Sequence, residues 1–133
     1  MRRIGLTGLF ILVMALTSQA AWAGNPHGVH DVTVTQSGNT LTAVGKEAGL
    51  GDETQVHISL TADAACINPG GNHPKAVNKT SVSAGADVPV QNGKAEFSIT
   101  ATATFKPDCS PPMTVVFSRI KVVDTTNGIT LFP

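Results

Sequence analysis

The sequence contains no tyrosine, and its single tryptophan, Trp22, lies close to the N-terminus. Because carbohydrate-binding and glycosidase sites depend on large aromatic rings for stacking, this shortage argues against both. Charged residues make up only 14% of the chain, and positive and negative side chains are equal in number. The sequence therefore lacks the basic footprint of a nucleic-acid-binding protein, and we expect no nucleic-acid partner.

The motifs of common catalytic and metal sites are also missing. No G-x-S-x-G nucleophile elbow occurs, and the two cysteines do not form a C-x-x-C pair. The four histidines, His27, His30, His57 and His73, are scattered over segments of different predicted structure. We therefore predict that the protein is not an enzyme, holds no metal and needs no cofactor.

The N-terminal 23 residues have the pattern of a secretory signal peptide. Arg2 and Arg3 precede an apolar stretch at residues 6–16, and Ala21-Trp22-Ala23 is an A-x-A cleavage site. The apolar stretch is too short to span a bilayer of about 30 Å, so we expect no membrane anchor. The sequence predicts residues 1–23 as a signal peptide and residues 24–133 as one secreted, extracellular domain.

Hydrophobic residues alternate with polar ones through most of residues 24–133, which indicates half-buried β-strands. The clearest examples are residues 55–61 and residues 97–105. About seven strands with frequent turn signals predict an all-β fold, an antiparallel two-layer β-sandwich of immunoglobulin-like type. The serine- and threonine-rich face of residues 98–104 should then be exposed. The predicted core consists of Val56, Ile58, Leu60, Phe97, Ile99, Phe105, Val115, Phe117, Ile120 and Val122.

Glycine-containing turns separate the predicted strands. Residues 37–39 predict a short hairpin turn, and Asn92-Gly93 and Asn127-Gly128 are candidates for type I′ turns. Residues 45–53 contain three glycines and predict a loop, in which residues 46–50 could form a single helical turn.

Two further features modify the predicted strands. Pro89 should confine its strand to a sheet edge or a bulge, because proline cannot donate a ladder hydrogen bond. The alternating apolar residues lie at odd positions before Ser118 and at even positions after Arg119, which predicts a β-bulge or a change of sheet.

Cys66 and Cys109 are the only cysteines, and in an oxidising compartment such a pair predicts one disulfide. The bridge would close a loop of about 44 residues, worth about 4 kcal/mol in the chain-entropy model. Two buried free thiols are the alternative at this point.

Residues 66–79 form the segment most suggestive of binding. The segment is long, rich in proline, glycine and asparagine, and would be tethered by the disulfide at one end. One interpretation is a stiff binding loop at the disulfide end of the sandwich, and the other is a purely structural crossover between the sheets. The candidate binding residues are Asn68, Asn72, His73, Lys75 and Asn78.

Several segments of the chain together resemble a group of small secreted bacterial proteins, chiefly actinobacterial. The resemblance lies in Lys-Glu-Ala-Gly-Leu-Gly at residues 46–51 and in residues 66–79, which fit the pattern C-x-N-x-G-G-x-x-P-x-A-x-N-K. It extends to Asn92-Gly93 and to the prolines that follow Cys109. The resemblance implies secretion but no activity, so no catalytic residue is carried over from it.

The predicted function is therefore that of a secreted, non-catalytic protein that acts by surface contact with an extracellular partner. We expect it to be a monomer. The alternative is a secreted inhibitor of subtilisin-type proteases, since residues 109–113 (Cys-Ser-Pro-Pro-Met) loosely match the exposed loop of such inhibitors. Two features disfavour it: only one disulfide is available, and prolines at positions 111 and 112 would hinder a substrate-like strand.

Overall fold

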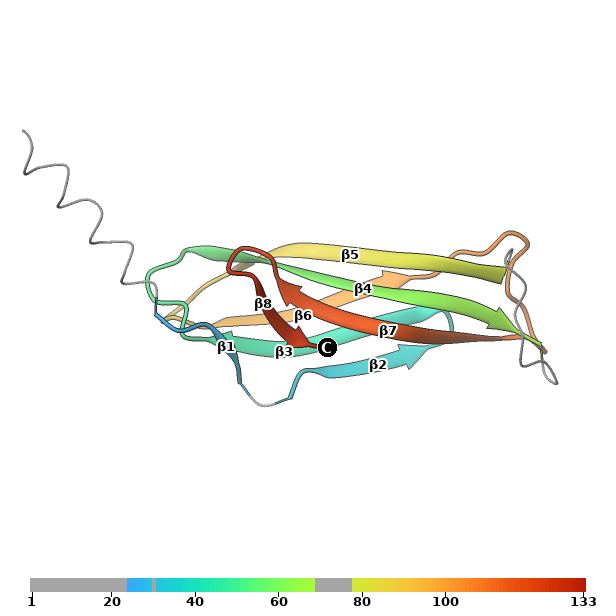
Figure 1. The fold of residues 1–133 in the computed structure, drawn as a ribbon, viewed down its shortest axis with the longest axis horizontal. Helices are drawn as coiled ribbons and strands as arrows, with labels where there is room; N and C mark the ends of the chain where they lie inside the picture. The colour runs from blue at the N-terminus through green and yellow to red at the C-terminus, as the bar shows by residue number, and fades with distance from the viewer. Residues whose placement is uncertain (1–23, 30, 69–77) are drawn as a thin grey trace, which may run out of the picture.

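In the residues that the structure describes, eight strands form two antiparallel sheets that pack face to face (Figure 1). The computed structural model describes residues 24–29, 31–68 and 78–133. The two packed antiparallel sheets confirm the predicted all-β sandwich. Among the described residues, none belongs to a helix with the length and hydropathy needed to cross a membrane.

The first sheet is organised around its longest strand, β3. Strand β6 pairs along one side of β3, while β2 and then β1 follow one another along its other side. The strand bounds are β1 His27–Gly28, β2 Thr33–Ser37, β3 Thr40–Ala48 and β6 Ala95–Thr102.

The second sheet has the order β5-β4-β7-β8, so β5 and β8 are its edges. Its strands are β4 Gln55–Ile67, β5 Lys79–Pro89, β7 Thr114–Asp124 and β8 Ile129–Phe132. Pro89 is the last residue of an edge strand, as predicted, so its missing N–H interrupts no central ladder.

The core lies between the sheets and follows the alternation in the sequence. Seven of the ten predicted core residues are buried, and Val115, Phe117 and Ile120 are partly buried against them. The serine and threonine side chains of residues 98–104 are exposed, as predicted. The prediction omitted two large side chains, Leu41 and Leu50, which are almost completely buried.

The predicted turn at Asn92-Gly93 is confirmed as a two-residue turn, but the strands on either side of it do not form a hairpin. Gln91 and Lys94 exchange backbone hydrogen bonds of 2.8 and 3.0 Å. Asn92 and Gly93 have φ angles of 55° and 76°, as a type I′ turn requires. Because β5 and β6 belong to different sheets, this turn carries the chain from one layer of the sandwich to the other.

The predicted type I′ turn at Asn127-Gly128 is wrong. Only Gly128 of the two has a positive φ, and Asp124 pairs with Ile129 across a longer connection. The side chain of Asp124 accepts hydrogen bonds from the backbone N–H groups of Thr126 and Asn127, and these bonds hold the longer turn.

The predicted loop at residues 45–53, with its helical turn, is also wrong in its first half. Residues 45–48 continue β3, where Lys46 pairs with Glu96 and Glu47 with Ala95. The ladder to β6 satisfies these backbone groups, and such tertiary pairing outweighs a weak local helix propensity.

The predicted irregularity at Ser118 and Arg119 is confirmed as a β-bulge. Strand β4 pairs Thr61 with Lys121 but Asp63 with Ser118, so β7 holds one residue more than β4 between these pairs. Arg119 takes a φ of 50°, in the left-handed region. The extra residue changes which positions of β7 face inward, from odd-numbered to even-numbered, so that both Phe117 and Ile120 face the core.

Candidate functional site

A disulfide joins Cys66, near the end of β4, to Cys109, in the segment between β6 and β7. The two Sγ atoms are bonded and the Cα atoms are 5.7 Å apart, which confirms the predicted bridge, and neither cysteine is a free thiol. Figure 1 shows the end of β4 and the starts of β5 and β7 together at this end of the molecule, opposite the turn between β7 and β8. We call it the disulfide pole.

The disulfide pole carries both ends of the predicted binding loop. Asn68 is exposed directly after β4, and Asn78 is partly buried directly before β5. Asn72, His73 and Lys75 lie outside the described residues. The structure therefore places two of the five candidate residues at one pole.

A side-chain hydrogen bond ties the two sheets together near this pole. Gln36 of β2 donates through Nε2 to the carbonyl of Val115 in β7, at 2.8 Å. Asn39 and Ala103 exchange two hydrogen bonds, of 2.9 Å from the side chain of Asn39 and 2.8 Å from the N–H of Ala103, which extend the pairing of β3 with β6 within the first sheet. The Gln36 bond and the disulfide restrict movement at the pole.

Residues 109–113, which the inhibitor hypothesis requires to be exposed and extended, fold back in a turn. The N–H of Met113 donates to the carbonyl of Ser110 at 2.9 Å. The Met113 side chain packs partly buried against the core, with its sulfur 3.7 Å from Sγ of Cys66. Protease clefts bind an extended peptide as an added strand, and this segment does not have that shape.

The outer face of β5, β4 and β7, beside the disulfide pole, holds two adjoining hollows that share Asp63, Ser81 and Arg119. We call the pair the Arg119 groove. Its outward-facing side chains form three rows, each read from β5 through β4 to β7: Lys79–Ala65–Val116, Ser81–Asp63–Ser118 and Ser83–Thr61–Lys121. Ile67, the last residue of β4, lines the end of the groove nearest the predicted binding loop.

Arg119 is placed over this groove by the β-bulge. Its side chain is 85% exposed, and its Nε donates to Oδ2 of Asp63 at 2.9 Å. Lys79 and Lys121 add two exposed cations, so the groove holds three positive charges and one negative charge. The sequence predicted binding residues in the loop at residues 66–79 and not on these strands. The reversed apolar alternation at Ser118 and Arg119 was nevertheless a sequence signal at the position of the groove.

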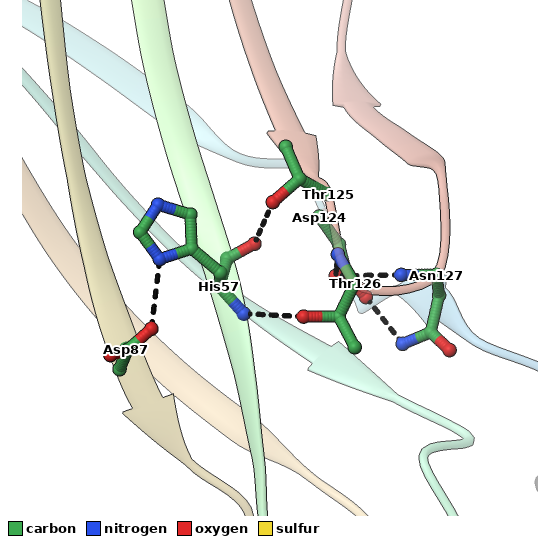
Figure 2. A network of polar contacts seen from close by, with 6 residues as sticks. All are labelled: His57, Asp87, Asp124, Thr125, Thr126 and Asn127. Carbon is green, nitrogen blue, oxygen red and sulfur yellow. Dashed lines mark hydrogen bonds and ion pairs between the residues drawn. The ribbon is translucent and has the colours of Figure 1, made fainter.

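A second polar region lies at the opposite end, where two acidic side chains are completely buried. Glu47 of β3 and Asp124 of β7 both have 0% exposure. Asp124 accepts hydrogen bonds from the N–H groups of Thr126 (2.8 Å) and Asn127 (3.1 Å), and from Nδ2 of Asn127 (2.7 Å; Figure 2).

Glu47 has a different environment. Neither of its carboxyl oxygens has a hydrogen-bond donor among the described residues. Burial raises its pKa to about 8, and its hydrogen bond with Asp124 and the charges of Asp124 and Glu53 raise it in the same direction. At neutral pH the carboxyl of Glu47 is therefore protonated. The sequence contained no signal for this pair, since the two residues are far apart in the chain.

His57 and Asp87 form an exposed pair on the outer face of β4 and β5, with Nδ1 of His57 2.8 Å from Oδ1 of Asp87 (Figure 2). The backbone of His57 hydrogen-bonds Thr125 and Thr126, which joins β4 to the turn after β7. The imidazole lies so close to Gly85 that a Cβ there would come within 2.7 Å of Nε2. No hydroxyl group of the described residues hydrogen-bonds Nε2, so a nucleophile–histidine–aspartate arrangement is not formed there.

Within residues 24–29, 31–68 and 78–133, no group of three or more His, Cys, Asp or Glu side chains is arranged to hold a metal ion.

Comparisons of the chain with protein-family models, with curated proteins and with solved structures found no match.

Proposed function

We propose that the protein is a secreted, non-catalytic binding protein that contacts an extracellular partner through the Arg119 groove. The proposal includes removal of residues 1–23 as a signal peptide. The observation that carries it is the β-bulge, which places the charged side chain of Arg119 over a hollowed sheet face. Bulges often re-aim a side chain at a functional position, and a left-handed backbone at a non-glycine residue is uncommon.

Three properties of the groove support this proposal. It lies on three long strands, of which β4 pairs with both β5 and β7, so its side chains are held by a rigid sheet. It borders the disulfide pole, where the bridge and the hydrogen bond from Gln36 to Val115 limit movement. A surface that is already ordered loses little conformational entropy on association, which favours binding by a small contact area.

Two exposed valines allow a matched test of the groove. Val116 lies in the groove and is 45% exposed, and Val44 lies on the other sheet and is 47% exposed. We expect Val116→Glu to abolish capture of the partner from the culture medium of the producing cells, because it places a bulky carboxylate against Ala65. Val44→Glu should capture the partner as the parent does. Capture is measured with each variant immobilised, followed by mass spectrometry.

Thermal unfolding of both variants provides the control, since exposed substitutions should change the free energy of unfolding by less than about 0.5 kcal/mol. Equal capture by Val116→Glu and the parent would show that the groove is not the contact surface. Stoichiometric inhibition of subtilisin by the purified mature protein would contradict the proposal in favour of the inhibitor hypothesis.

A further inference from the structure

We infer that the partner presents an acidic, extended peptide segment to the Arg119 groove. This inference rests on the proposed function and adds the chemical class of the bound segment.

Charge is the first observation that supports an acidic ligand. Residues 24–133 contain seven basic and nine acidic side chains, so the mature chain carries a net negative charge. The groove has the opposite balance, with Lys79, Arg119 and Lys121 against Asp63. Complementary charge of this kind steers association and sets the orientation of the partner.

The spacing of the cations matches an extended chain. Lys79 is in the first row of the groove and Lys121 in the third, so they are separated by the length of β4 from Ala65 to Thr61. At the rise of a β-strand this separation is about 13 Å along the strand, and because Lys79 and Lys121 lie on the strands to either side of β4, they are also about 10 Å apart across the sheet. In an extended peptide, side chains four residues apart point the same way and are about 13 Å apart, and the long lysine side chains can cover the remaining distance. Two acidic residues at positions i and i+4 would therefore reach both lysines, with a third at i+2 near Arg119.

The remaining surface of the groove favours a peptide over an acidic polysaccharide. None of the residues lining the two hollows is aromatic, so no ring is offered for a sugar to stack on. Val116, Ala65 and Ile67 instead form a small apolar floor at one end. Such a floor suits an aliphatic side chain of a peptide.

Asp63 occupies the position that a carboxylate of the ligand would take. Its Oδ2 accepts from Nε of Arg119 at 2.9 Å, and both side chains remain accessible to solvent. A carboxylate of the ligand would therefore take the place of the Asp63 carboxylate as the partner of Arg119. The groove should bind acidic segments more tightly when Asp63 is neutral.

The test uses a fluorescein-labelled peptide of about seven residues, alternating glutamate and valine, which extends over roughly 20 Å. Matched peptides carry lysine or glutamine in place of glutamate, and binding to the mature protein is followed by fluorescence polarisation. We expect saturable binding of the acidic peptide alone, weakening as salt screens the charges.

Two substitutions in the groove should act in opposite directions. Arg119→Gly removes the guanidinium and keeps a residue that readily adopts φ 50°, so the bulge is retained. It should weaken peptide binding by about tenfold, the effect of losing a hydrogen bond to a charged group. Asp63→Asn should strengthen binding by about threefold, because the exposed Asp63–Arg119 ion pair would no longer compete with the peptide carboxylate for Arg119. Lys94→Gln, a charge loss at the turn between β5 and β6, is the matched control and should have no effect.

Equal binding of the three peptides, or unchanged binding to Arg119→Gly, would overturn the inference. Arg119-dependent binding of polygalacturonate without binding of the acidic peptide would overturn the choice of a peptide. If the acidic peptide does not bind but Val116→Glu still abolishes partner capture, the inference fails while the proposed function stands.

Discussion

Replacing Glu47 with glutamine is expected to stabilise the protein by about 3 kcal/mol at pH 7 and to leave its stability nearly unchanged at pH 4.5. The introduced glutamine has nearly the shape of the protonated carboxyl of Glu47 and, like it, adds no charge beside Asp124. Unlike that carboxyl, it holds no proton that can be lost as the pH rises.

The direction follows from the two pKa values of Glu47. The ordinary value is 4.5, and the folded value is raised to about 8 by burial, by the hydrogen bond with Asp124 and by the charges of Asp124 and Glu53. Below pH 4.5 the carboxyl is protonated in both states, and its contribution to stability is complete. Between pH 4.5 and about 8 only the folded state holds the proton, so stability falls as pH rises. The loss is about 1.4 kcal/mol per pH unit, which reaches about 5 kcal/mol above pH 8.

Urea unfolding of the parent and of Glu47→Gln at pH 4.5, 7 and 9 measures this difference. Glu96→Gln, a loss of charge at an exposed position of β6, should follow the parent at every pH. A constant difference between the parent and Glu47→Gln across the three pH values would show that Glu47 does not titrate as described.

Removing the disulfide should have a comparable effect on stability. The bridge joins residues 43 positions apart. Its loss, in Cys66→Ala with Cys109→Ala, should lower the free energy of unfolding by about 4 kcal/mol because the unfolded chain gains freedom. For a domain of this size that corresponds to a fall in Tm of about 15 °C.

Thermal unfolding with and without reductant checks this result and its cause. Reductant should lower the Tm of the parent to that of the double variant and leave the double variant unchanged. Equal Tm values for parent and double variant under oxidising conditions would refute the contribution of the bridge.

Local pattern was sufficient to predict much of the fold. The alternation in residues 55–61 and 97–105 determined which side chains face the core, because successive side chains of a strand point to opposite faces. The reversal of this alternation at Ser118 and Arg119 predicted the bulge for the same reason. Asn92-Gly93 predicted its turn because both residues tolerate a positive φ. The pairing of Cys66 with Cys109 followed from there being no other cysteine.

The features that failed or were missed depend on contacts between distant parts of the chain. Residues 45–48 are strand because β6 pairs with them, and the turn after Asp124 is held by that side chain and not by Asn127-Gly128 alone. The raised pKa of Glu47 depends on residues that reach it only when the sheets pack. The Arg119 groove likewise requires β5, β4 and β7 to lie in register, which brings Lys79 and Lys121 to one face. Sequence periodicity determines which side of a strand is buried, but the neighbours of that strand, and hence the charges that meet on its faces, are decided by long-range pairing.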